Sequence, residues 1–83
     1  MQQAIRTYRL PATNTKGQRV KAVCYGGSVV VPWDYRLDVE PNHCRAAWKL
    51  ARKLGEEVSP YELLGGSLPD GSYCWIRDTW EAP

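Results

Sequence analysis

The fold is decided by the stretch Arg19-Val20-Lys21-Ala22-Val23-Cys24-Tyr25-Gly26-Gly27-Ser28-Val29-Val30-Val31-Pro32-Trp33. Its first part alternates between two kinds of side chain and its second part is a β-branched run, a pattern typical of two strands. Gly26-Gly27 predicts the hairpin turn between them, because glycine adopts the positive φ angles that tight hairpin turns favour. The register that follows leaves one face wholly apolar, with Cys24 opposite Val29, Ala22 opposite Val31 and Val20 opposite Trp33.

A further strand is predicted before this hairpin. Residues 4–10 contain β-branched and aromatic side chains and end before Pro11, so they predict a strand over Ala4–Leu10. The connection Pro11–Gln18 is rich in hydroxyl groups and contains Asn14 and Gly17, which favour turns. It is too long and too polar for a plain turn, and we expect an exposed loop that could serve as a recognition edge.

One amphipathic helix is predicted after the hairpin. Asp38 is a good N-cap and Gly55 a good stop, so the helix occupies the residues between them. Apolar residues recur along it at steps of three and four, namely Cys44, Ala47, Trp48, Ala51 and Leu54. We expect this stripe to pack on the sheet, with Trp48 and Trp33 anchoring the core.

The last third of the chain predicts a short helix, a turn and a strand. Ser59-Pro60-Tyr61-Glu62 has the form of a capping box, which favours a second helix through Leu64. Leu68-Pro69-Asp70-Gly71 predicts a turn. Residues 72–79 then predict a strand that places Cys74 and Ile76 on one side and Tyr73, Trp75 and Arg77 on its outer side.

Together these elements predict an α+β protein of one domain, residues 1–83. The expected order is β-β-β-α-β, with an antiparallel sheet of about four strands, one amphipathic helix packed on one face and a short second helix. A chain of 83 residues has too little surface to bury a second core.

The composition argues for a soluble protein and excludes several classes. Eleven Lys and Arg against nine Asp and Glu give a net charge of +2, too small to require a polyanionic partner. The longest apolar run is far shorter than the roughly 20 residues of a membrane span, and the N-terminus lacks the apolar core of a signal peptide. Three widely spaced cysteines do not suggest a disulfide framework, so buried thiols are expected. We expect a cytoplasmic monomer or homodimer without membrane contact.

The sequence contains no recognisable catalytic or cofactor-binding motif. His43 and the three cysteines could form a zinc set, but only His43 and Cys44 are close in sequence, and adjacent helical residues point apart. His43 falls in the first turn of the helix, where a solvated or capping role is expected, so no pair of nucleophile and base is indicated. The glycine pairs lack the lysine and hydroxyl of a phosphate loop. We therefore expect no enzyme activity, no metal ion and no cofactor.

Basic residues recur on the other side of the predicted helix. They are Arg45, Lys49, Arg52 and Lys53. Because such cations contact phosphates, a small nucleic-acid-binding protein that uses this helix face is one functional hypothesis. An ordinary solvated helix face would explain the same pattern.

Three stretches of the chain carry a resemblance to a known family. They are Thr7-Tyr8-Arg9-Leu10-Pro11-Ala12-Thr13-Asn14-Thr15-Lys16-Gly17-Gln18-Arg19-Val20-Lys21-Ala22, Val39-Glu40-Pro41-Asn42-His43 and Gly66-Ser67-Leu68-Pro69-Asp70-Gly71-Ser72-Tyr73. Here the chain resembles a family of short proteins encoded by bacterial phages, plasmids and integrated elements. Cys44, Pro41 and the Trp-rich tail depart from the usual pattern of that family. The resemblance brings no catalytic residues with it.

The resemblance implies that the protein helps a mobile element to overcome the defence of its bacterial host. Small proteins of such elements are often inhibitors of host defence, and anti-CRISPR proteins are similar in size and in single-domain build. A stoichiometric inhibitor of a bacterial host-defence complex, a CRISPR effector first of all, is therefore the leading expectation. Aromatic and arginine side chains are enriched at binding hot spots. The candidate contact residues are Lys16 and Arg19 on the loop, Tyr73, Trp75 and Arg77 on the outer face of the last strand, and Trp80 in the tail.

Overall fold

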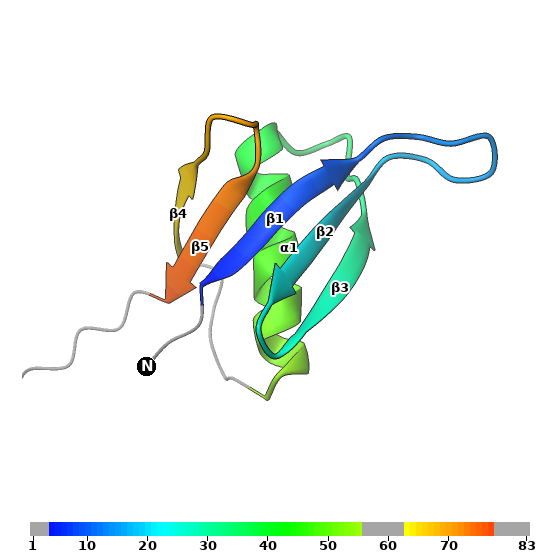
Figure 1. Cartoon of the computed structure of the whole chain (residues 1–83). Coiled ribbons are helices and arrows are strands. Elements are labelled where there is room, and N and C mark those ends of the chain that lie inside the picture. The colour runs from blue at the N-terminus through cyan, green and yellow to red at the C-terminus, as the bar shows by residue number, and fades with distance from the viewer. Residues whose placement is uncertain (1–3, 56–62, 78–83) are drawn as a thin grey trace, which may run out of the picture.

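The computed structural model describes residues 4–55 and 63–77, which fold into two layers. Within these residues a five-stranded antiparallel sheet forms one layer, and one helix lies across one of its faces (Figure 1). The elements in chain order are β1 (Ile5–Leu10), β2 (Arg19–Cys24), β3 (Gly27–Pro32), α1 (Val39–Lys53), β4 (Leu63–Ser67) and β5 (Tyr73–Arg77). The predicted α+β class and the amphipathic helix are confirmed, and the sheet has one strand more than predicted.

The central strand of the sheet is β1. The order is β3-β2-β1-β5-β4, because α1 carries the chain across the sheet to the edge opposite β3 before the β4–β5 hairpin forms. The loop 11–18 between β1 and β2 projects well beyond the sheet (Figure 1), and residues 11–17 are exposed. A turn closes this loop, since the Thr13 N–H donates to the Lys16 carbonyl at 2.8 Å. The prediction of an exposed loop is confirmed.

The β2–β3 hairpin has the predicted faces but not the predicted register. Cys24 lies opposite Gly27 rather than Val29, a difference of two residues. The turn is centred on Tyr25 and Gly26, neither of which has a positive φ, whereas Gly27 has a φ of 154°. A shift of two residues returns every side chain to the same face. The apolar alternation therefore could not distinguish the two registers.

The helix begins and ends where predicted, but a different side of it faces the sheet. It runs from the N-cap Asp38 to a C-terminal Gly55 with a φ of 89°. Its buried residues are Asn42, His43, Ala46, Ala47, Leu50 and Ala51. The predicted stripe shares only Ala47 and Ala51 with this set. The predicted stripe lies on the wrong side of the helix because it was built from apolar residues alone, whereas two of the buried residues are Asn42 and His43.

Asn42 fixes the chain that enters the helix. Its Nδ2 donates to the carbonyls of Asp34, Leu37 and Asp38 at 2.9, 3.1 and 3.0 Å, and its Oδ1 accepts the Asp34 N–H at 2.8 Å. The side chain of the N-cap Asp38 makes no capping hydrogen bond. A buried amide inside the helix thus holds the preceding loop from within, which satisfies backbone groups that burial would otherwise leave unpaired.

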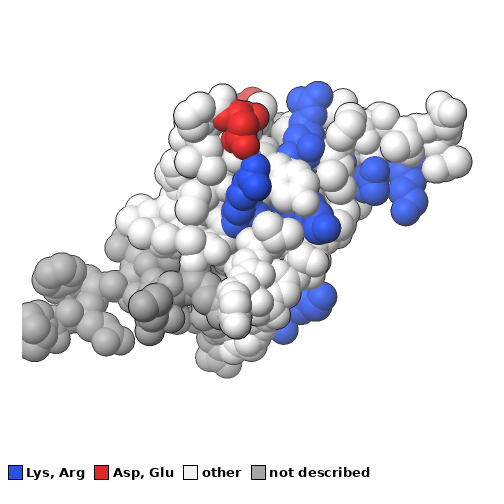
Figure 2. Space-filling model, in the orientation of Figure 1, with Lys and Arg blue, Asp and Glu red and all other residues white. Residues whose placement is uncertain are grey.

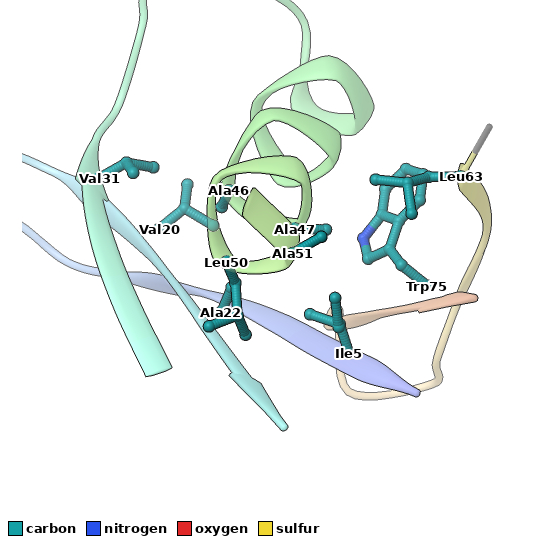
Figure 3. Packing of buried hydrophobic residues seen from close by; sticks show 10 residues of the cluster. All are labelled: Ile5, Val20, Ala22, Val31, Ala46, Ala47, Leu50, Ala51, Leu63 and Trp75. Carbon is teal, nitrogen blue, oxygen red and sulfur yellow. The ribbon is translucent and has the colours of Figure 1, made fainter. Parts of the chain in front are cut away.

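The core lies between the sheet and α1 (Figure 3). It consists of Ile5, Val20, Ala22, Val31, Ala46, Ala47, Leu50, Ala51, Leu63 and Trp75. Trp75 is 3% exposed, and its indole lies beside Leu63 (Figure 3). Trp48 and Trp33 are only half-buried at the margin of this cluster, so the prediction that they anchor the core is wrong. Three alanines on the helix let it approach the sheet closely, and Trp75 supplies the large ring instead.

The sequence did not predict β4. Its first two residues were expected to end a short helix, and Ser59–Glu62, which would begin that helix, lies outside the described residues. The stretch Leu63-Leu64-Gly65-Gly66-Ser67 does not alternate, and its glycines suggest a break. Pairing with β5 forms the strand nonetheless, with Gly65 opposite Trp75. A Cβ on Gly65 would lie 2.4 Å from the Trp75 ring, so glycine lets the indole lie against the β4 backbone.

Gly65 and its neighbour Gly66 offer a matched test of this packing. Gly65→Ala should lower the free energy of unfolding by about 1–3 kcal/mol, because the methyl group forces the buried indole to move. Gly66→Ala should cost much less, since nothing lies within 4 Å of its Cβ position. Urea unfolding followed by tryptophan fluorescence measures both. Equal stability of the two variants would contradict the assignment of Trp75 as the ring that packs on β4.

Candidate functional site

A buried hydrogen-bond chain determines which face of the sheet the helix covers. The Trp75 Nε1–H donates to Thr7 Oγ1 at 3.0 Å, and Thr7 Oγ1 lies 2.8 Å from His43 Nδ1. Thr7 and His43 are at most 1% exposed. The chain joins β5, β1 and α1, so the face that carries Thr7 is held against the helix. The opposite face of the sheet is not covered by α1.

His43 is a core residue, and the expectation that it is solvated or caps the helix is wrong. Its ring packs against Tyr73, with 4.5 Å between ring centroids, and edge-on to Trp33 at 6.2 Å. Burial lowers the pKa of His43 below its usual value, a backbone hydrogen bond with Thr7 opposes that shift, and the nearby charge of Arg9 adds to it. The imidazole is therefore neutral at neutral pH. Both His43 and Thr7 are buried, so this pair packs within the core.

Removal of the Thr7 hydroxyl tests the importance of this chain. Thr7→Val keeps the shape of the side chain but leaves the Trp75 and His43 nitrogens without their partner, so unfolding should become easier by about 2–4 kcal/mol. Thr7→Ser keeps the hydroxyl and loses one methyl group, which should cost only about 1 kcal/mol. Chemical unfolding of the two variants gives the comparison. A valine variant as stable as the serine variant would show that the chain contributes little.

The side of the sheet that faces away from α1, which we call the open face, carries the residues that alternate with the core. By strand register these are Arg6, Tyr8, Leu10, Arg19, Lys21, Val23, Ser28, Val30, Pro32, Leu64, Gly66, Cys74 and Ile76. The helix lies behind the sheet in Figure 1, so Figure 2 looks onto this face. Lys and Arg side chains are spread over it and towards the β1–β2 loop, whereas acidic side chains gather at one margin (Figure 2).

The three cations of the open face lie on the two neighbouring strands β1 and β2. Arg6 is opposite Val23, Lys21 is opposite Tyr8, and Arg19 is opposite Leu10. No cation is therefore directly opposite another, and no cation is opposite a carboxylate in this pairing. The charges gather on one face without the direct cross-strand repulsion that destabilises a sheet.

Arg6 is held in place by the turn between β4 and β5. Its Nη2 donates to Asp70 Oδ2 at 2.8 Å, and its Nε donates to Ser72 Oγ at 3.4 Å. Hydrogen bonds from the Ser72 hydroxyl and N–H, together with the Arg6 charge, lower the pKa of Asp70 below its usual value. Asp70 is therefore ionised at neutral pH, and it offsets one positive charge at the margin of the open face.

Tyr8 stands on the central strand beside a cleft of about 440 Å³. The cleft is lined by Arg6, Tyr8, Val23 and Ser72 among others. The Arg6 guanidinium carbon lies 5.5 Å from the centre of the Tyr8 ring, within the range of a cation–π contact. The volume falls within the roughly 300–1,000 Å³ of small-molecule sites. An aromatic ring, two arginines, a hydroxyl and the Asp70 carboxylate thus border one hollow.

The structure separates the residues that were predicted to contact a protein partner. Lys16 and Arg19 lie on the projecting loop and at the start of β2, as expected. Trp75 faces the helix and Tyr73 is half-buried beside His43, so the prediction that they stand on an outer face of the last strand is wrong. The predicted alternation along this strand is correct, but its two faces are exchanged, so that Cys74 and Ile76 are the residues that face away from the helix. Arg77 ends β5, and Trp80 lies outside the described residues.

The basic residues of the helix are partly engaged within the molecule. Arg45 lies 3.8 Å from an Asp34 carboxylate oxygen, and Lys53 Nζ donates to the Ser28 carbonyl at 2.9 Å. The Arg52 guanidinium lies 5.3 Å from the centre of the Trp48 ring. Lys49 is exposed. These residues share a helix side as predicted, but several of them also hold neighbouring parts of the fold.

Cysteines and potential metal ligands are further chemically reactive groups in residues 4–55 and 63–77. All three cysteines are half-buried thiols outside any disulfide, and burial raises the pKa of Cys44. No cluster of three or more His, Cys, Asp or Glu that could hold a metal ion occurs within residues 4–55 and 63–77. In the same parts of the chain, no helix has the length and apolar character needed to cross a membrane.

No protein-family model, no curated protein and no solved structure matches this chain. Its function is therefore argued from the geometry of its own residues.

Sequence reasoning missed Tyr8 and Arg6 as candidate functional residues. The signal was present in the first strand, where Ile5 and Thr7 alternate with Arg6 and Tyr8. Threonine and isoleucine on one side indicate the buried face, and arginine and tyrosine on the other then face outward. The strand was recognised, but its two faces were not assigned.

Proposed function

We propose that this protein binds nucleic acid through the open face of its sheet. The observation that carries the proposal is the placement of Arg6, Arg19 and Lys21 together on that face, with Lys16 on the adjoining loop. Cations grouped on one surface bind the phosphate backbone and release its counterions. The small net charge of the whole chain does not oppose this, because the local distribution of charge decides where a polyanion binds.

The open face is a better candidate than the helix for this role. Arg45 and Lys53 of the helix interact with Asp34 and Ser28, and nucleic acid would have to compete with those contacts. On the open face only Arg6 is paired with a carboxylate in the described part of the chain. Nucleic-acid binding, the alternative function predicted from the sequence, is therefore proposed again, with the open face of the sheet as the binding surface in place of the helix.

Two charge reversals on opposite sides of the molecule test the proposal. Lys21→Glu on the sheet should weaken the binding of a fluorescein-labelled oligonucleotide and reduce the slope of log Kd against log salt by about one or more. Lys49→Glu on the helix changes the net charge equally and should leave both quantities nearly unchanged. Fluorescence anisotropy over a range of salt concentrations measures them.

The opposite pattern in this experiment would place binding on the helix. Equal losses in the two variants would indicate only a response to net charge, and absence of binding by the wild-type protein at low salt would refute the proposal. Far-UV circular dichroism of both variants controls for folding.

A second candidate function, inhibition of a bacterial host-defence complex by protein binding, is favoured by a different observation. Leu64, Leu68 and Ile76 are exposed and line a groove of about 390 Å³ along the edge strand β4. Exposed apolar patches of this kind mark protein interfaces. The resemblance to proteins of phages and plasmids, and through them to anti-CRISPR proteins, supports the same reading.

Expression in a bacterium with an active CRISPR system tests this second function. The wild-type protein should restore plaque formation by a phage that the system targets. Ile76→Asp should abolish the effect, because a charge in the groove opposes burial against a partner. Lys21→Glu should retain it if the groove is the contact. No protection of the phage by the wild-type protein would refute inhibition of that system.

A further inference from the structure

We infer that the cleft beside Tyr8 holds one unpaired nucleotide, so that the open face prefers single-stranded to double-stranded nucleic acid. The inference rests on the proposed function and specifies its ligand. It is carried by the position of an aromatic ring at the centre of the sheet, with cations on both sides of it.

Tyr8 has the surroundings that a stacked base requires. It stands on the central strand, where its neighbours are side chains of the sheet and, on the side of β5, the turn residues Asp70, Gly71 and Ser72. Lys21 lies directly opposite it on β2, and Arg6 lies two residues away on the same strand. A base that stacks on the ring would have its phosphates within the field of Lys21 and of Arg6, whose charge Asp70 partly offsets. Stacking on aromatic residues together with a basic track is the usual means of binding single strands.

The cleft gives the base a place to enter the surface. Val23 and Ser72 line it together with Arg6 and Tyr8, so an apolar wall and a hydroxyl lie near the ring. Asp70 and Ser72 hold the Arg6 side chain beside Tyr8 before any ligand arrives. Such preorganisation reduces the entropy that binding must otherwise overcome.

A duplex cannot use the same site. Its bases are paired and stacked on one another, so they offer no free ring face on which Tyr8 could stack. The bases of a single strand are able to splay out and lie on aromatic side chains of a sheet. Lys16, Arg19 and Lys21 would attract either form, but Tyr8 would contribute only to the binding of an unpaired strand.

The experiment compares two substitutions of Tyr8 and two forms of one ligand. Affinities of the wild-type protein, Tyr8→Leu and Tyr8→Phe are measured for a short oligothymidylate and for its duplex with oligoadenylate. The wild-type protein should bind the single strand more tightly. Tyr8→Leu should weaken single-strand binding about tenfold, since base–aromatic stacking has that order of effect, and should leave duplex binding unchanged. Tyr8→Phe keeps the ring and should retain the preference.

The outcomes separate this inference from the proposed function. If the wild-type protein binds both ligands equally, or if the leucine and phenylalanine variants behave alike, the nucleotide site is refuted while binding that is sensitive to Lys21→Glu still stands. If neither ligand binds at low salt, both proposals fail. Unfolding midpoints of the two variants establish that a loss of affinity does not come from a loss of folding. As an independent readout, the ring resonances of Tyr8 should shift on titration with the oligothymidylate.

Discussion

The structure depends on one buried hydroxyl group, that of Thr7. It accepts a hydrogen bond from the Trp75 indole and contacts the His43 imidazole, and these three residues come from β1, β5 and α1. A buried donor or acceptor without a partner costs more than an ordinary hydrogen bond contributes. Helix and sheet can therefore pack well only in the arrangement that brings the three groups together. In a core whose helix presents mainly alanines, this polar chain supplies specificity that small apolar side chains cannot.

The same constraint defines the surface on which function is proposed. Side chains alternate along a strand, so the position of Thr7 against the helix directs Arg6 and Tyr8 to the other side. The register then places Val23 and Lys21 of β2 beside them. The open face is in this sense the complement of the core. A substitution that changed the orientation of β1 would disturb both at once.

The parts of the fold that could be predicted are those that local chemistry determines. Alternation identified the strands of the β2–β3 hairpin and their faces, and Asp38 and Gly55 marked the ends of the helix. Long-range packing determined the rest. The glycine-rich β4 becomes a strand because β5 pairs with it. His43 is buried because it packs against the sheet, where Thr7 Oγ1 is its hydrogen-bond partner. Of the residues in the proposed nucleic-acid surface, Lys16 and Arg19 were expected from the sequence at a binding surface, but as contacts to a protein partner.

The placement of Trp75 illustrates why aromatic residues were harder to assign than charges. A tryptophan in an alternating strand can face either the core or a partner, and its alternation with Cys74 and Ile76 does not say which. Gly65 decides the matter, because only a residue without a Cβ leaves room for the indole on the helix side. Because Gly65 belongs to β4, the side to which Trp75 points can be predicted only when the pairing of β4 with β5 is known.

The distribution of charge across the open face has an energetic consequence. A sheet gains stability when opposite charges lie across from one another on neighbouring strands. Lys21 instead lies between Tyr8 and Val30, and Arg19 lies between Leu10 and Pro32, so neither cation has a carboxylate opposite it. The sheet thereby forgoes a stabilising pair at two positions while avoiding direct repulsion. The positive field of these side chains is then directed outward, where an anion from another molecule can neutralise it. A surface that served only to keep the protein soluble would gain more from charges of both signs, and this difference supports the proposed binding of an anion there.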